Sequence, residues 1–200
     1  MQRRTPTRGR GAWPGVLLAA CVALRAAAAA PSPELLDFSA DEVARLVRHG
    51  PWPPAAALDA GNAAAASPQA VALGEQLFFD ARLSADGTLS CGTCHRPELA
   101  FADGRARGVG RELLDRNTPS LWNAVNERWY GWDGAADSLW SQAIRPILDA
   151  REMAATPSHV RATIAGDAKL TCRYAQAFGQ NPGSDDETVL VNAAKAIGAF

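Results

Sequence analysis

Cys91-Gly92-Thr93-Cys94-His95 is the segment of this 200-residue chain from which most of its organisation can be inferred. It matches C-x-x-C-H, the attachment signature of c-type haem. Two thiols at this spacing can reach the two vinyl groups along one edge of a porphyrin and form thioethers, and the imidazole that follows then lies under the iron. We therefore expect one covalent haem on Cys91 and Cys94, with His95 as an iron ligand.

Three other interpretations of the Cys pair need features that the sequence lacks. A thioredoxin-like redox pair belongs to a βαβ context, and no strand pattern precedes Cys91. A zinc site needs a second pair of ligands at suitable spacing, and the remaining histidines are His49 and His159. A structural disulfide between Cys91 and Cys94 would leave His95 without a role.

The first 30 residues have the composition of an export signal peptide. A basic region to Arg10 precedes an apolar stretch over 15–24 and a run of alanines. The apolar stretch is too short to span a bilayer as a permanent helix. Leu18-Ala19-Ala20-Cys21 also resembles a bacterial lipobox, so cleavage near 28–30 and a lipid anchor at Cys21 both stay open. Either places the mature protein in the periplasm or on a membrane facing it.

The charge of the chain argues against a nucleic-acid partner. The formal net charge is −1, but residues 1–30 contain five arginines and no acidic residue. The rest of the chain has 15 basic against 21 acidic residues, a net charge of −6. Such a chain has no basic excess to neutralise phosphates, so we expect no nucleic-acid binding.

Residues 31–66 are expected to form an N-terminal segment with one short helix and a Pro/Ala-rich linker. The capping box Ser39-Ala40-Asp41-Glu42 begins this helix, and Val43, Leu46 and Val47 are expected to face inward. The prolines at 51–54 forbid helix in the linker.

Residues 67–200 are expected to form the haem domain. Helix signals predict helices over 67–79, 137–148, 158–178 with a break near Gly166, and from 186 to the end, with Cys172 in the helical core. From Cys91 to Asp133, irregular chain rich in Gly, Pro and aromatic residues suits a wall around a flat apolar ligand. The fold class is therefore mostly α, a cytochrome c-like haem domain with long irregular loops.

Six segments, one of which contains the Cys pair, occur in the order and spacing of a known family. They are Leu77-Phe78-Phe79-Asp80, Arg82-Leu83-Ser84, Ser90 to His95, Arg116-Asn117-Thr118-Pro119, Trp132-Asp133-Gly134 and Gln142 through Glu152-Met153. Residues 68–200 thereby resemble the N-terminal haem domain of the bacterial dihaem cytochrome c peroxidases and the related methylamine-utilisation enzymes. Members of that family continue into a second haem domain. The apolar pattern of the last helix runs on to Phe200 without a stop signal, so we expect the chain to be cut short before such a domain.

The resemblance implies a role for each matching residue. His95 corresponds to the proximal ligand of the peroxide-handling haem. Gln142 and Glu152 correspond to the distal-pocket pair, although each would also suit a solvent-facing position. Trp132 corresponds to the aromatic residue between the two haems, and Asn117 to a calcium ligand at the domain interface.

Two positions depart from the family pattern. The peroxidases have a distal His that ligates the resting haem and must move away, and this chain has Val109 there. Valine cannot bind iron, so the site is expected to be open without reductive activation, as in the methylamine-utilisation branch. Ala135 follows Asp133-Gly134 where the family commonly has Arg, and nothing in the sequence explains this difference.

The leading hypothesis for function is a peroxidase that reduces hydrogen peroxide with electrons from a small cytochrome c or cupredoxin. One alternative is an electron carrier in which Met153 is the second axial ligand, and His49 is a further residue that could reach the iron from the far side. A second alternative is a haem enzyme that oxidises a protein side chain. A homodimer is left open.

Overall fold

The structure, a computed structural model, describes residues 37–50 and 59–200 and is mostly helical, as the sequence predicts. The chain divides into two units, Met1–Gly50 and Pro51–Phe200. No strand forms in the described ranges, where pairing is limited to three isolated bridges in loops. None of the helices described here has both the length and the apolar character needed to cross a membrane. The predicted signal peptide and Cys21 lie outside the described residues.

In the first unit, the capping box forms and begins α1 (Ala40–Val47). Ser39 accepts from the Glu42 N–H, and the Glu42 carboxylate accepts from the Ser39 N–H at 2.8 Å. The expected burial of the apolar face is wrong, because Val43, Leu46 and Val47 are all exposed. Local capping therefore predicts where α1 begins, whereas burial depends on contacts that lie beyond the helix.

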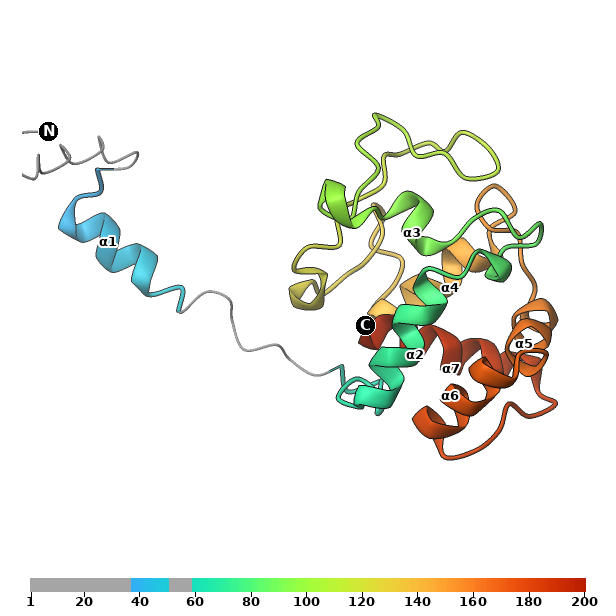
Figure 1. The fold of residues 1–200 in the computed structure, drawn as a ribbon. Helices are drawn as coiled ribbons and strands as arrows, with labels where there is room; N and C mark the ends of the chain where they lie inside the picture. The colour runs from blue at the N-terminus through green and yellow to red at the C-terminus, as the bar shows by residue number, and fades with distance from the viewer. Residues whose placement is uncertain (1–36, 51–58) are drawn as a thin grey trace, which may run out of the picture. The chain divides into compact units, whose positions relative to one another are not determined.

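The described residues of the second unit form six further α-helices. They are α2 (Pro68–Phe78), α3 (Cys91–Cys94), α4 (Leu139–Leu148), α5 (Pro157–Ala165), α6 (Ala168–Phe178) and α7 (Asp186–Ala199), with short 3₁₀ turns at Ala81–Leu83, Pro97–Leu99 and Ala124–Asn126. Figure 1 shows α2, α4, α5, α6 and α7 gathered into one bundle. Helices α2, α4 and α5 pack against α7, and α6 packs against α2 and α5. The bundle core consists of large apolar side chains from these helices, among them Leu73, Leu77, Ile164, Leu170 and Leu190.

Two glycines allow the helices of the bundle to approach each other closely. A Cβ on Gly74 of α2 would lie 1.9 Å from the carbonyl oxygen of Ala196 in α7. A Cβ on Gly198 would lie 3.0 Å from the backbone nitrogen of Trp140 in α4. Both α2 and α4 therefore pack closely against α7, and these two helices position the site.

The expected burial of Cys172 is wrong. Leu170 and Tyr174 of α6 are buried, but Cys172 is exposed. A residue two positions from each of two buried neighbours lies about 200° around a helix from both, so it faces the opposite side.

Candidate functional site: an apolar cavity beside the Cys pair

Helix α3 holds the two thiols of the Cys pair and packs against Phe79, directly after the end of α2. A Cβ on Gly92 would lie 2.5 Å from the Phe79 ring, so glycine between the two cysteines lets α3 lie against this ring. Burial raises the pKa of the Cys91 thiol to about 12 and also raises that of Cys94. Both side chains are therefore thiols at neutral pH, and Cys91, Cys94 and Cys172 are free of disulfides.

The His95 ring is held by a backbone carbonyl. Nδ1 lies 2.9 Å from the carbonyl oxygen of Phe101. A carbonyl only accepts, so Nδ1 carries the proton and Nε2 is left for iron. Burial lowers the pKa of His95, while the Phe101 and Pro119 carbonyls partly oppose this shift. The ring is therefore neutral at pH 7, the form that binds metals.

The chain around Phe101 adopts an unusual conformation to reach His95. Ala100 and Phe101 have φ values of 56° and 55°, in the left-handed region. This conformation costs a non-glycine residue roughly 1–2 kcal/mol. Such strain persists where surrounding contacts require it, and here the Phe101 carbonyl bonds His95 while the Ala100 carbonyl accepts from Ser120 at 2.6 Å.

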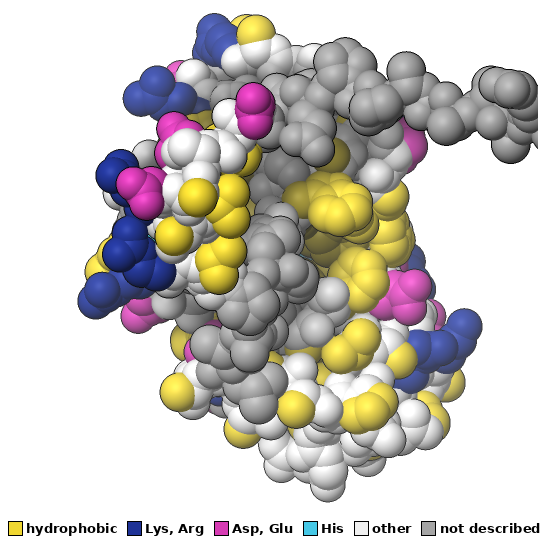
Figure 2. All heavy atoms as spheres, turned by 90° about the vertical axis from the view of Figure 1, so that its left-hand side faces the viewer, with side chains coloured by type: hydrophobic (Ala, Val, Ile, Leu, Met, Phe, Trp, Pro, Cys, Tyr) yellow, Lys and Arg dark blue, Asp and Glu magenta, His cyan; other side chains and the backbone are white. Residues whose placement is uncertain are grey.

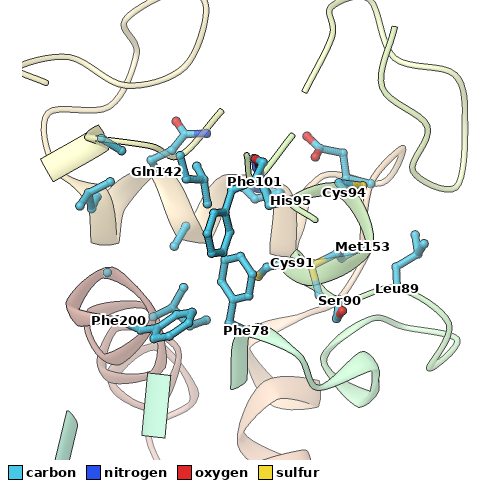
Figure 3. A pocket seen from close by; sticks show the side chains of 18 of the residues that line it. Phe78, Leu89, Ser90, Cys91, Cys94, His95, Phe101, Gln142, Met153 and Phe200 are labelled. Carbon is cyan, nitrogen blue, oxygen red and sulfur yellow. Dashed lines mark hydrogen bonds between the residues drawn. The ribbon is translucent and has the colours of Figure 1, made fainter. Parts of the chain in front are cut away.

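The Cys pair and His95 lie at a cavity of about 530 Å³, shown from close by in Figure 3. This volume is within the roughly 300–1,000 Å³ typical of cofactor and small-molecule sites. Its lining is mainly apolar and includes Phe78, Leu89, Phe101, Leu121, Leu139 and Phe200. A second cavity of about 690 Å³ shares Cys94, His95, Gln142 and Glu152 with the first.

Gln142 extends from α4 into the wall of both cavities. Figure 3 shows its amide on the same side of the pocket as His95 and Phe101. Its Oε1 is buried and has no hydrogen-bond partner among the described residues. A buried unpaired amide oxygen costs about 1–3 kcal/mol, so its position indicates a partner supplied by a ligand or water. The structure therefore does not support the solvent-facing alternative.

Glu152 follows α4 and lines both cavities. It is the one carboxylate among the described residues that line the first cavity. Burial raises the pKa of Glu152, and the nearby charge of Asp149 adds to this effect, while Arg151 and Arg145 oppose it. A carboxyl group with a raised pKa in a cleft can exchange protons near neutral pH more readily than an exposed one.

Met153 is 4% exposed and belongs to the apolar core, and it also lines the first cavity. Figure 3 shows it near Cys91 and Ser90, on the Cys side of the pocket. The side chain is thus already packed among core residues.

Trp132 and Asn117 line the second cavity. The Trp132 indole N–H donates to the Asn117 carbonyl at 2.8 Å, and the Trp132 side chain is 60% exposed. Hydrophobic side chains gather on the face shown in Figure 2, and Trp122 and Trp129 are further large exposed side chains of the second unit. Trp132 is therefore a surface residue here rather than a core residue.

Val109 does not occupy the cavity wall, which at this point is formed by Gly110. The Val109 carbonyl faces the Cys94 sulfur at 3.7 Å. His49 belongs to the first unit, so its approach to iron stays a prediction. Val109 offers no ligand atom for iron, and Gln142 and Glu152 contribute polar side chains to the cavity wall.

These residues fit a c-type haem. The site offers two thiols, a neutral imidazole with Nε2 available and an apolar cavity of suitable volume. Gln142 also lines that cavity, and its buried Oε1 has no hydrogen-bond partner among the described residues. Within the described residues, no group of three or more His, Cys, Asp or Glu side chains could hold a metal ion directly. The fold and the site together define a helical c-type haem domain.

The comparisons with known proteins identify the family. The family model described as di-haem cytochrome c peroxidase matches residues 68–200, and the chain belongs to this family. The methylamine utilization protein MauG of Methylorubrum extorquens is 39% identical over 136 residues, which are 67% of this chain and 37% of that protein. The cytochrome c551 peroxidase of Pseudomonas aeruginosa is 37% identical over 64% of this chain and 37% of its own length.

Similar solved structures also come from MauG-like proteins and diheme peroxidases. A MauG-like protein associated with microbial copper homeostasis has a TM-score of 0.63 and 29% identity over 75% of this chain and 46% of that chain. The diheme peroxidase BthA from Burkholderia thailandensis has a TM-score of 0.59 and 29% identity over 66% of this chain and 38% of its own. The present chain thus spans less than half the length of these relatives.

Proposed function

We propose that this chain is the peroxide-handling haem domain of a periplasmic peroxidase that reduces hydrogen peroxide. The observation that carries the proposal is the pair in the cavity wall, Gln142 with a buried unpaired oxygen and Glu152 with a raised pKa. A plain electron carrier has no use for a proton-exchanging group over an open cavity. The names of the relatives, which include cytochrome c peroxidases, support the same reaction.

Cys91 and Cys94 would attach the haem and His95 would hold its iron through Nε2. When bound, the haem supplies the electrons that break the O–O bond. Gln142 can orient peroxide by hydrogen bonding but cannot relay a proton. Glu152 can do so, because its carboxylate could accept a proton from one peroxide oxygen and deliver it to the other. The overall reaction takes two electrons and two protons per peroxide and gives two waters.

We propose a small cytochrome c or cupredoxin as electron donor, and export to the periplasm with either a cleaved signal or a lipid anchor at Cys21. A second haem domain and a homodimer also stay proposals. The resemblance also implies calcium at Asn117, an ion that takes about six to eight oxygen ligands. The Asn117 amide donates its Nδ2 hydrogen toward the Thr118 carbonyl at 3.5 Å, and no acidic cluster accompanies it among the described residues.

Glu152→Gln tests the proposed function. Removal of a positioned general acid/base costs about 10²- to 10⁴-fold in rate, and the amide keeps the shape of the side chain. We expect a loss of this size in peroxide turnover by the protein as the cell makes it, with haem content and spectrum unchanged. Glu75→Gln, at an exposed carboxylate on α2, is the matched control. Turnover by Glu152→Gln at the unmutated rate would contradict the assignment.

Met153 supports one alternative because it also lines the cavity. In that case the chain would be an electron carrier with His95 and Met153 as axial ligands, and peroxide would find no open position at the iron. The two functions predict different visible spectra for the ferric protein.

A further inference from the structure

A loop formed by residues 108–112 packs directly on the backbone that carries Glu152. A Cβ on Gly110 would lie 2.6 Å from the carbonyl oxygen of Arg151 and 2.8 Å from the Cα of Glu152. Both contacts are with backbone atoms, which cannot rotate away as a side chain can. Gly110 does not have a positive φ angle. Glycine is therefore required here by the close approach of the Arg151–Glu152 backbone and not by the backbone conformation of residue 110.

Hydrogen bonds fix the same contact. The Glu112 N–H donates to the Arg151 carbonyl at 3.0 Å, the oxygen against which Gly110 lies. The Gly110 N–H donates to the Glu112 carbonyl at 3.0 Å, so the loop is closed on itself. The Arg151 guanidinium bonds Asp115 at 2.9 Å, which adds a contact between the two segments at the surface.

The segment that bears Glu152 is a tight turn at the end of α4. The N–H groups of Glu152 and Ala154 both donate to the Asp149 carbonyl, at 3.0 and 2.9 Å. Gly110 and Glu152 line the first cavity together. The loop at 108–112 is therefore the neighbour against which this turn lies beside the cavity.

We propose that Gly110 is a positioning residue that sets the depth at which Glu152 stands in the cavity wall. The inference rests on the proposed function, in which Glu152 moves a proton. Any side chain at position 110 would push the Arg151–Glu152 backbone away from the loop. A displacement of about 1 Å at a reacting group can cost roughly 10²-fold in rate.

The test is Gly110→Ala in the protein as the cell makes it, compared with Gly108→Ala. A Cβ on Gly108 would meet two side-chain atoms, at 3.1 Å from Thr118 Oγ1 and 3.3 Å from Leu114 Cδ1, which can shift. We expect Gly110→Ala to lose about 10- to 10²-fold in peroxide turnover with haem content unchanged, and Gly108→Ala to lose much less. Equal losses in the two variants would overturn the inference.

A double variant separates positioning from general damage to the fold. In a Glu152→Gln background, Gly110→Ala should cost nothing further, because the group that it misplaces is already gone. If the double variant instead loses turnover by the product of the two single-variant factors, the inference is overturned. If Glu152→Gln turns over peroxide at the unmutated rate, the proposed function fails. If Glu152→Gln loses activity but Gly110→Ala keeps the unmutated rate, only the positioning inference fails.

Amide hydrogen exchange gives a readout that does not depend on activity. In the unmutated protein the amides of Glu112 and Glu152 should open together, since one packed contact protects both. In Gly110→Ala both should exchange faster, while amides in the middle of α7 should not. If Gly110→Ala does not accumulate, the unmutated protein still decides: free exchange at Glu112 with protection kept at Glu152 would overturn the inference.

Discussion

The helical bundle and the loop wall at residues 95–137 use different means to fix their positions. In the bundle, α2 and α4 are placed by close contact with α7, and core side chains such as Leu73 and Leu190 are at most 1% exposed. In the wall, single hydrogen bonds and left-handed residues hold the chain, as at Phe101 and His95. Under the proposed function, the bundle core provides stability, whereas the chemistry belongs to residues of the wall, of α3 and of the cavity side of α4. Variants in the two regions should therefore separate folding from function.

The largest effect is expected at the Cys pair. The double variant Cys91→Ala, Cys94→Ala should lose all haem that survives denaturation, because no thiol remains beside His95 to form a thioether. Cys172→Ala is the control, since this third thiol is exposed and distant in sequence. Measured as absorbance of the denatured exported protein, covalent pigment in the double variant would contradict the attachment site.

The pH dependence of turnover should follow Glu152. Its carboxylate must be ionised to accept a proton, and burial raises its pKa above the ordinary 4.5, so activity should fall as pH drops through this raised value. Below it, kcat/KM should change about tenfold per pH unit. The Glu152→Gln profile should lack this limb. The same acid limb in both proteins would assign it to another group.

The bundle should respond in stability rather than in chemistry. Gly74→Ala places a Cβ where the Ala196 carbonyl lies and should destabilise the protein by about 1–3 kcal/mol, the usual cost of overpacking. Peroxide turnover per folded, haem-containing protein molecule should stay unchanged. Gly183→Ala, where a Cβ would meet nothing within 4 Å, is the matched control in urea unfolding. Equal unfolding midpoints for the two variants would show that the α2–α7 contact is not tight.

The smallest effect is expected at Met153. The ferric protein should be largely high-spin, because Val109 offers no ligand and Met153 is packed in the core. Met153→Leu should therefore leave the visible spectrum as it is. A sulfur-to-iron band in the near infrared that disappears in Met153→Leu would favour the electron carrier.

The sequence predicts the features of this protein that depend on local chemistry. Ser67 before Pro68 predicts where α2 begins, and the capping box at Ser39 predicts α1. Gln142 and Glu152 are predicted as pocket residues through the family resemblance alone, because α4 and the turn after it show no catalytic signature of their own.

Non-local features could not be read from the sequence. Ala100 and Phe101 carry none of the Gly or Asn signals of left-handed backbone, so the carbonyl that holds His95 was missed. The contact between Gly110 and Glu152 joins two loops through backbone atoms, which leave no pattern in the sequence. The prediction that Cys172 is buried is wrong, because the buried residues Leu170 and Tyr174 lie on a face of α6 that Cys172 does not share.

Extraction of the unmutated, exported protein with acid acetone tests the central claim most directly. Thioethers to Cys91 and Cys94 keep a c-type haem on the polypeptide after the fold and the iron ligands are lost. The account predicts that the pigment stays with the precipitated protein. Pigment that passes into the acetone would show that the haem is not covalently attached and would contradict the claim.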